Sequence, residues 1–373
     1  MEIVEKKVSM TELFFDLIFV WATARMTHML HHLHNGIIEP IEYSKYLITY
    51  ISWINVWMIQ TVFNNRYSDD DIVDQLFTYF NMFLLLLLLN FVNRDFQEVF
   101  IIYNRLTVIV TISQICQYIR QFYKRNDQEN RELIKSFIFT LLLKATIIGV
   151  GGFLPYDIGV VVVVIGILVA WLYPIIYINR MKKVPINFPN LVERLTLLMI
   201  ITFGETMLSI ATYFQVNTYI NTFICFVMVA SLFFYYRIVF NDIIEHHNHN
   251  ATGVGFMYLH YMILIGISAV TISINALADK EVNNAFVVIF LYLAFLVFYL
   301  GIFLNYKYNK KSHQYSMKCI INHFIILILG GIISFIMREN HTAILGISAL
   351  VNLFSAVNIW RFSKNCVLTK NKK

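Results

Sequence analysis

The feature that most constrains this chain is the recurrence of apolar stretches of about 20 residues, the length that an α-helix needs to cross a hydrocarbon core of about 30 Å. Twelve such stretches follow one another, and short linkers with turn residues such as Asn35, Gly36 and Pro155 separate them. Backbone polar groups inside a bilayer need internal partners, so these stretches are predicted to be helices. The predicted spans are residues 11–33, 43–64, 72–92, 97–123, 133–154, 156–180, 191–215, 218–240, 257–278, 284–306, 317–336 and 341–361.

The composition supports a membrane protein and excludes a soluble enzyme. Hydrophobic residues make up 58% of the chain and charged residues 14%, whereas soluble domains contain about 25% charged residues. We therefore predict an all-α, polytopic transmembrane helix bundle, with membrane lipid as a partner. The net charge of +6 is spread over the loop ends, so no binding of nucleic acid is expected.

The distribution of Lys and Arg predicts the orientation, because cytoplasmic loops carry an excess of both. With the N-terminus in the cytoplasm, about 22 of the 29 Lys and Arg residues fall on the cytoplasmic side. The residues expected outside are Lys45, Arg94, Lys280 and Arg338, and those within spans are Arg25, Arg105 and Lys144. We predict a multi-pass protein of the cell membrane, with both termini in the cytoplasm.

Two short matches indicate an internal duplication. Glu12 near the start of the first span corresponds to Glu193 near the start of the seventh, and residues 62–65 (VFNN) correspond to residues 239–242 (VFND). Six spans separate the copies, so both would have the same orientation, as in several transporter folds. The predicted halves are residues 1–183 and 184–373. Chance similarity between apolar helices is the alternative.

Ionisable residues within spans are the first candidates for function, because burying them in a bilayer is costly. Glu12 and Asp16 are four residues apart and share one helix face. Glu205 lies about 18 Å along its span, near the bilayer midplane, and the adjacent Gly204 would let another backbone approach closely. Glu205 is the leading candidate for a proton or cation site. The alternative is a carboxylate that pairs with Lys144 or Arg105.

Two charged residues stand near the start of the seventh span. An acidic residue in a first helical turn interacts favourably with the helix dipole, so a capping role is the alternative for both Glu193 and Glu12. Arg194 is too far from Glu205 along the helix to touch it. Asp16 is on the opposite side of its helix from Arg25, so the two residues are expected to meet different neighbours.

Histidines are grouped at two places, His28, His31 and His32 in the first case and residues 245–249 (EHHNH) in the second. Imidazole clusters can bind metals, but the predicted topology places the two groups on opposite membrane faces. Interfacial or loop histidines are the simpler interpretation, and His260 within a span is either a packed residue or a proton relay. The four cysteines form no CxxC pair. We predict no metal and no cofactor.

The sequence resembles a known family at three places. Residues 11–20 (TELFFDLIFV) followed by His28 are similar to the opening of the low temperature requirement A (LtrA) family of bacterial membrane proteins. Residues 192–194 (VER), 200–201 (II) and 204–205 (GE) are similar to a second signature, and residues 259–261 (LHY) to a third.

This resemblance implies a set of site residues but no settled activity, because the family is named for growth in the cold. The implied residues are Glu12, Asp16, His28, Glu193, Arg194, Gly204 and Glu205; secondary candidates are Arg25, Arg105, Lys144 and His260. Arg25 stands where relatives are expected to have a neutral polar residue, which changes the charge balance.

Three functions remain open from the sequence. The first is a secondary transporter or carrier, with or without proton coupling, whose small-molecule or ion substrate binds between the first and seventh spans, near Asp16 and Glu205. The second is a membrane-embedded enzyme acting on lipid or a lipid-linked substrate, and the third is a non-catalytic role in signalling or assembly. No nucleotide-binding motif is present, so the transporter hypothesis does not include ATP hydrolysis.

Overall fold

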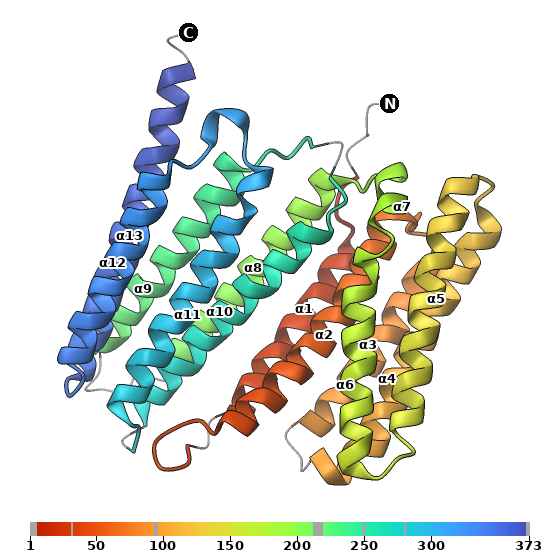
Figure 1. Ribbon diagram of the computed structural model, residues 1–373, viewed down its shortest axis with the longest axis horizontal. Helices are drawn as coiled ribbons and strands as arrows, with labels where there is room; N and C mark the ends of the chain where they lie inside the picture. The colour runs from red at the N-terminus through yellow and green to blue at the C-terminus, as the bar shows by residue number, and fades with distance from the viewer. Residues whose placement is uncertain are drawn as a thin grey trace. The chain divides into compact units, whose positions relative to one another are not determined.

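The computed structural model describes residues 6–30, 33–92, 96–211, 219–248, 251–279 and 281–370, with the backbone alone at residues 28, 92 and 367–370. These residues form α-helices, short 3₁₀ turns and one π-helical segment, without a β-strand among them (Figure 1). The structure therefore confirms the predicted all-helical, polytopic class.

Nine helices of the described part are long and apolar enough to cross a membrane, counting with α6, α9 and α11 the short helical segments that follow them. They are α3 (Ile72–Val92), α4 (Phe96–Lys124), α5 (Gln128–Gly151), α6 (Tyr156–Leu172), α9 (Tyr219–Arg237), α10 (Val254–Ala278), α11 (Asn284–Leu304), α12 (Met317–Ile336) and α13 (His341–Lys370).

Three more predicted spans are also helical but more polar. They are α1 (Met10–Thr27), α2 (Pro40–Arg66) and α8 (Phe188–Ile210). Helices α1 and α8 each contain three charged residues, and α2 contains several amide and hydroxyl side chains. A count of twelve spans stays a prediction, since length and apolarity alone support nine.

Several predicted boundaries were wrong for identifiable reasons. The first span was predicted to reach residue 33, but α1 gives way to a 3₁₀ turn (His28–Leu30), and a turn with positive φ at Asn35 and Gly36 follows. The predicted span 156–180 is interrupted, because Pro174 cannot continue a regular helix. A 3₁₀ turn (Tyr173–Ile175) follows α6, and α7 (Ile178–Lys183) completes the segment. Helix α5 begins earlier than predicted because Asp127 caps it.

The chain divides into two compact units. Unit 1 comprises Met1–Met29, Ile41–Leu195 and His247–Met257, and unit 2 comprises Leu30–Pro40, Thr196–His246 and Tyr258–Lys373. Helices α8 and α10 each contribute residues to both units. The predicted duplication, and with it the boundary at residue 183, stays a prediction. Locally the matched segments differ, because residues 62–65 are α-helical and residues 239–242 lie in a π-helix (Ile238–Ile243).

Unit 1 contains α1 to α7 and the beginnings of α8 and α10. Helix α3 packs against α1 and α4, and α5 packs against α4 and α6. Phe100, Ile148, Val163 and Ile167 form an apolar cluster where α4, α5 and α6 meet. Away from that cluster the interior is rich in amide and hydroxyl side chains, especially on α2 and α4.

Unit 2 contains α9, the rest of α8 and α10, and the helices from α11 to α13. Helix α13 packs against α9 and α12, and α12 packs against α11. Helices α10 and α11 approach closely at two glycines: a Cβ on Gly266 would lie 2.7 Å from the backbone nitrogen of Phe298, and a Cβ on Gly301 would lie 2.8 Å from Ile263. Such contacts are typical of helices that pack in membranes.

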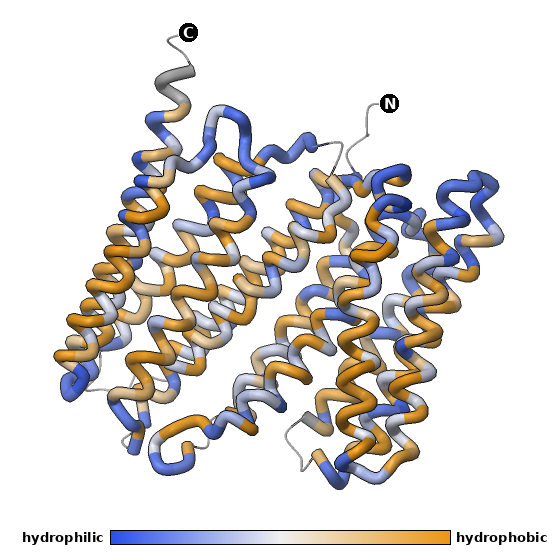
Figure 2. Tube along the Cα trace, in the orientation of Figure 1, coloured by the Kyte–Doolittle hydropathy of each residue, from blue (hydrophilic) through white to orange (hydrophobic). Residues whose placement is uncertain are grey.

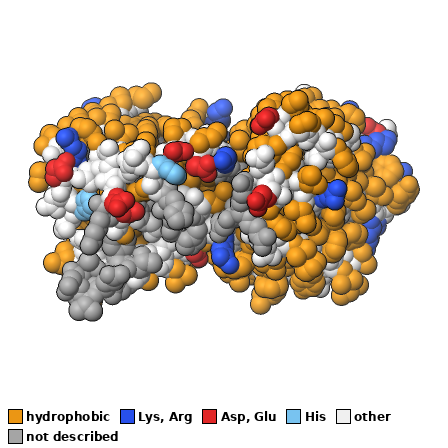
Figure 3. Space-filling model, turned by 90° about the horizontal axis from the view of Figure 1, so that it is seen from below, with side chains coloured by type: hydrophobic (Ala, Val, Ile, Leu, Met, Phe, Trp, Pro, Cys, Tyr) orange, Lys and Arg blue, Asp and Glu red, His pale blue; other side chains and the backbone are white. Residues whose placement is uncertain are grey.

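The surface of each unit has the polarity expected of a protein in a bilayer. Hydrophobic residues occupy the middle of most helices, and hydrophilic residues gather at the helix ends and in the loops (Figure 2). Large apolar side chains such as Leu76, Phe80 and Phe83 on α3 are exposed. In a space-filling view, hydrophobic side chains cover much of the visible face and charged ones are scattered (Figure 3). Lipid tails are the environment that such surfaces require.

Candidate functional site

The site begins with the way the chain starts α1. Ser9 precedes the helix, and its hydroxyl accepts a bond from the backbone N–H of Glu12 at 3.3 Å. In return, Oε2 of Glu12 accepts the backbone N–H of Ser9 at 3.0 Å. This reciprocal capping box fixes the first turn. The capping role considered for Glu12 is therefore confirmed, and the same carboxylate has its second oxygen available for another partner.

 That partner is Arg194 on α8, whose guanidinium binds two carboxylates of α1, those of Glu12 and Asp16. Its Nη1 lies 3.4 Å from Oε1 of Glu12, and its Nη2 and Nε lie 3.1 Å and 3.4 Å from the two oxygens of Asp16. The indole N–H of Trp57 on α2 donates to Asp16 at 2.6 Å, and the guanidinium lies 5.5 Å from the centre of the Trp57 ring. We call Glu12, Asp16, Trp57 and Arg194 the acid–arginine cluster.

The acid–arginine cluster is buried and its charges do not balance. Asp16 and Arg194 have no exposed surface and Glu12 is 3% exposed. A guanidinium can bond two carboxylates at once, and such charge-assisted bonds are strong. However, two carboxylates face one guanidinium, and an uncompensated charge in a buried site is costly. A proton or a cation would remove the excess negative charge, so the arrangement is suited to binding one of them.

Lys6 is the other cation near this cluster. Its ammonium donates to the backbone carbonyls of Asn64 at 2.6 Å and Ser68 at 2.7 Å. Burial lowers the pKa of Lys6, and the negative charge of Glu12 opposes that shift. The positive charge of Lys6 therefore attracts the negative charge of Glu12 without a hydrogen bond between them. The hydrogen bonds of Lys6 join the N-terminal segment to the end of α2.

Three asparagines fix the start of α8 and thereby the position of Arg194. Asn187 stands directly before α8, and its side chain accepts the backbone N–H of Asn190 at 3.3 Å. The side chain of Asn65 donates to Asn190 at 2.6 Å and accepts the backbone N–H of Asn187 at 2.9 Å. These bonds join the end of α2 to the first turn of α8. They fix the position of that turn, from which Arg194 follows toward α1.

Of the predicted site residues, the structure brings together Glu12, Asp16 and Arg194 in unit 1. Glu193 is exposed. The capping role considered as the alternative for Glu193 does not apply, because α8 begins at Phe188 and Glu193 lies beyond the first turn. Arg25 is also exposed, with its guanidinium 5.4 Å from the ring centre of Trp21, which confirms that it and Asp16 occupy different sides of α1.

The remaining candidates in unit 1 lie apart from the acid–arginine cluster. Arg105 is exposed on α4. Lys144 is fully buried on α5, and its ammonium donates to Oδ1 of Asn55 at 2.9 Å. His28 begins the 3₁₀ turn after α1, and its side chain lies outside the described part of the structure, as do residues 31 and 32. The sequence pattern gave no indication that Asn55 is the partner of Lys144.

Unit 2 holds the other three candidates. Glu205 is half-buried on α8. The close backbone approach predicted at Gly204 was wrong within the described residues, because no atom lies within 4 Å of the position that its Cβ would occupy. His260 is buried on α10, where its Nε2 lies 3.2 Å from the hydroxyl of Tyr236 and its ring packs on Phe240. Glu205 and Asp16 thus belong to different compact units.

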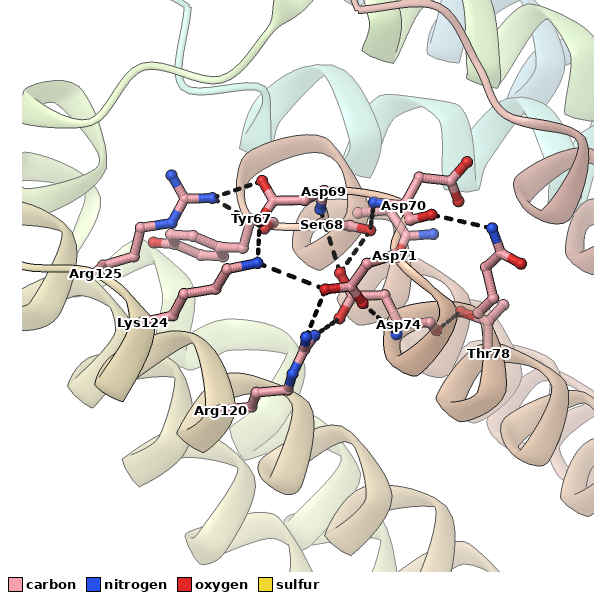
Figure 4. A network of polar contacts seen from close by, with 12 residues as sticks. Tyr67, Ser68, Asp69, Asp70, Asp71, Asp74, Thr78, Arg120, Lys124 and Arg125 are labelled. Carbon is pink, nitrogen blue, oxygen red and sulfur yellow. Dashed lines mark hydrogen bonds and ion pairs between the residues drawn. The ribbon is translucent and has the colours of Figure 1, made fainter.

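A second polar network, which the sequence analysis missed, joins the loop before α3 to the end of α4 (Figure 4). Arg120 bonds Asp71 at 2.5 Å and Asp74 at 2.6 Å. Lys124 bonds Asp69 at 2.5 Å, and Arg125 lies 3.3 Å from the same carboxylate. The signal was present as an acidic run at residues 69–74 and a basic run at residues 120–125.

This network has a measurable electrostatic consequence. The hydrogen bond from Arg120 holds the pKa of Asp71 well below its usual range, and a backbone N–H from Asp74 adds to the effect. The aspartates cap the first turn of α3, since Asp71 accepts the N–H of Asp74 at 3.0 Å. The network therefore ties α3 to α4 at one end of unit 1, and its contacts are those of a structural clamp.

No group of three or more His, Cys, Asp or Glu side chains with metal-binding geometry occurs among the described residues. His246 bonds the backbone carbonyl of Phe240 at 2.7 Å, and His249 lies outside the described residues. The four cysteines, all described, are free thiols.

Comparison with protein families agrees with these features. The model of the family described as "Bacterial low temperature requirement A protein (LtrA)" matches residues 7–356. The chain belongs to the LtrA family. The matched region includes the complete acid–arginine cluster as well as Lys144 and Asn55. This LtrA-family chain is thus an integral, multi-pass membrane protein with several apolar helices. A search of curated proteins found no match.

Proposed function

We propose that this LtrA-family protein is a proton-coupled secondary carrier of the cell membrane, with both termini in the cytoplasm. The observation that carries the proposal is the excess of one carboxylate in the acid–arginine cluster. Glu12 and Asp16 share Arg194 in a buried position, at 3.4 Å and 3.1 Å. One exchangeable proton on this carboxylate pair would neutralise the excess charge.

The charged groups around the pair support this role. Arg194 on α8 faces both carboxylates, Trp57 on α2 donates to Asp16, and Lys6 acts on Glu12 from the N-terminal segment. Protonation of either carboxylate removes one partner of Arg194, so it weakens the attachment of α8 to α1. Loading with a proton thereby changes the relative stability of two helix arrangements, which is the coupling that a carrier requires.

The proposed proton belongs to the pair and not to one residue. Asp16 accepts two bonds from Arg194 and one from Trp57, whereas Glu12 accepts one from Arg194 and one from the backbone of Ser9. Both carboxylates bond the guanidinium of Arg194, so a proton on either one would remove the excess charge of the pair. Replacement of either one by its amide would therefore remove the exchangeable proton, because a single carboxylate would remain to balance Arg194.

Proton flux into proteoliposomes tests the proposal. A potassium diffusion potential, negative inside, is imposed, and a trapped pH dye reports the internal pH. We expect acidification with the unaltered protein and its loss in both Glu12→Gln and Asp16→Asn. Glu193→Gln is the matched control, because Glu193 is an exposed carboxylate beside Arg194, and it should retain the flux. Equal flux in Asp16→Asn and the unaltered protein would contradict the proposal, whereas absence of flux in both would exclude a proton leak without the substrate.

A second candidate function is an enzyme acting on a lipid, which one feature of unit 1 favours. A largely apolar cavity of about 450 Å³ lies among the beginnings of α2, α4 and α6, with Lys45, Tyr156 and Asp157 in its wall. Its volume suits part of a lipid molecule. Incubation with membrane lipids, followed by mass spectrometry, tests this function. A lipid product that requires Asp157, and is absent with Asp157→Asn, would favour the enzyme over the carrier.

A further inference from the structure

Lys144 has an unusual environment for a charged residue. It lies within the apolar helix α5 and is fully buried. An ammonium group has three N–H donors, and among the described residues Asn55 is its one hydrogen-bond partner, at 2.9 Å. No carboxylate in the described part of the chain forms an ion pair with it. Buried charges are normally paired, so a protonated Lys144 requires an anionic partner at this position.

A stripe of polar side chains on α4 faces the interior of unit 1 at the same level as Lys144. Its members follow one another three or four residues apart and extend over about 25 Å of the helix. The polar stripe consists of Asn104, Thr107, Thr111, Gln114, Gln117 and Gln121, all of them buried. Gly152, which directly follows α5, lies beside Asn104, and Gly149 of α5 lies beside Val108. This antiparallel register places Lys144 level with the part of the stripe between Thr111 and Gln114.

Many atoms of this region make no hydrogen bond. Gln114 donates to the backbone carbonyl of Val56 at 3.0 Å, but its Oε1 has no partner among the described residues. The same holds within those residues for both amide atoms of Asn104 and Gln117, and for Nδ2 of Asn55. Buried amides are normally satisfied. The Asn55 amide, which already orients Lys144, thus has an N–H donor available on the same side chain.

The acid–arginine cluster is not this anionic partner. Asn55 and Trp57 are two residues apart on α2, so their side chains point about 200° apart around the helix. Trp57 bonds Asp16 on one face, while Asn55 bonds Lys144 on the other. The body of α2, about 10 Å across, separates the two groups. The carboxylate of Asp16 therefore lies on one face of α2 and the ammonium of Lys144 on the other.

We propose that a small monovalent anion binds at Lys144, held by its ammonium and by the side-chain N–H of Asn55. A single positive charge requires a single negative charge, and amide N–H groups are suitable donors to an anion. The polar stripe supplies a polar route along α4 toward this position. As cargo of the carrier, which rests on the proposed function, the anion would bind on one face of α2 and the coupling proton on the other.

Chloride is the probe for a binding experiment on the full-length protein in detergent. The melting temperature is measured in sodium chloride and in sodium gluconate at equal ionic strength and constant pH. A ligand of the folded state raises the melting temperature as its concentration increases. We expect a rise with chloride relative to gluconate in the unaltered protein and in Lys144→Arg, and its loss in Lys144→Gln. Lys135→Gln, an exposed lysine on the same helix, should retain the full rise.

Asn55→Asp gives an independent test, because it places a carboxylate next to Lys144 without changing the shape of the side chain. We expect this variant to lose the chloride-dependent rise and to melt in gluconate at least as high as the unaltered protein does in chloride. No rise in the unaltered protein, or an equal rise in Lys144→Gln or Asn55→Asp, would overturn the inference. No membrane gradient is involved, so this result is separate from a failure to detect proton flux.

Discussion

The guanidinium of Arg194 donates two hydrogen bonds to the carboxylate of Asp16, at 3.1 Å and 3.4 Å, although 178 positions separate the two residues in the sequence. This contact joins the first helix to the helix that begins the second half of the chain. It lies within unit 1 and has no exposed surface. The stability of this Arg194–Asp16 contact, and the protonation of Asp16, therefore determine how firmly α1 packs against the start of α8.

The first prediction concerns the stability of this contact. Arg194→Gln should lower the free energy of unfolding by about 3–5 kcal/mol, because it leaves buried carboxylates without their cation. Arg194→Lys should lower it less, since lysine retains the charge but cannot make the same forked bonds. Arg25→Gln is the control, since Arg25 is exposed, and should change stability by about 0.5 kcal/mol or less. Denaturant titration in detergent measures all three, and equal effects of Arg194→Gln and Arg25→Gln would contradict the prediction.

A second prediction concerns the clamp between α3 and α4. The Arg120 bond depresses the pKa of Asp71 in the folded protein, so Asp71 stabilises the fold above its unfolded pKa of about 4. That contribution is lost as the pH falls from this value toward the lower folded pKa. The melting temperature should therefore decrease below about pH 4, and Asp71→Asn should reduce the decrease. Asp70→Asn should follow the unaltered protein, and an unchanged slope in Asp71→Asn would count against the clamp.

A third prediction tests the close packing of α10 and α11 in unit 2. Gly266→Ala would bring a Cβ to 2.7 Å from the backbone of Phe298, and overpacking of this kind costs about 1–3 kcal/mol. Gly346→Ala is the matched control, because no described atom lies within 4 Å of the position of its Cβ. Melting temperatures in one detergent should be lower for the first variant and unchanged or higher for the second. The reverse order would show that these helices pack differently.

The fourth prediction concerns the capping box of α1. Ser9→Ala removes the acceptor for the backbone N–H of Glu12, and the loss of an N-cap costs about 0.5–2 kcal/mol. Thr11→Ala, within the same turn, should cost less, since it leaves the box intact. Denaturant titration compares the two. Equal losses would mean that the capping box does not stabilise the start of α1.

Part of this site could be predicted from the sequence because it depends on local spacing. The four-residue interval between Glu12 and Asp16 placed both carboxylates on one face of α1, and the structure confirms this, since both bond Arg194. The same helical geometry correctly placed Arg25 on another side. Both inferences needed only the period of an α-helix and no knowledge of which helices are neighbours.

The rest depended on contacts between distant segments. The pairing of Arg194 with Asp16, and of Lys144 with Asn55, requires the packing of helices that no local pattern specifies. The capping role considered for Glu193 does not apply because the start of α8 is set by Asn187 and its bond to Asn65. Pro174 is a sequence signal for the interruption after α6. The apolar residues around it nevertheless led to the prediction of one continuous span.

The proton on the Glu12–Asp16 pair can be observed directly by infrared difference spectroscopy of the purified protein during an acid titration. A carboxyl group that takes up a proton gains the carbonyl stretching band of the neutral acid. We predict that one buried carboxyl gains this band on acidification, that Glu12→Gln and Asp16→Asn each remove it, and that Glu193→Gln retains it. A band that is unchanged in both variants of the pair would contradict the claim that this pair carries the coupling proton.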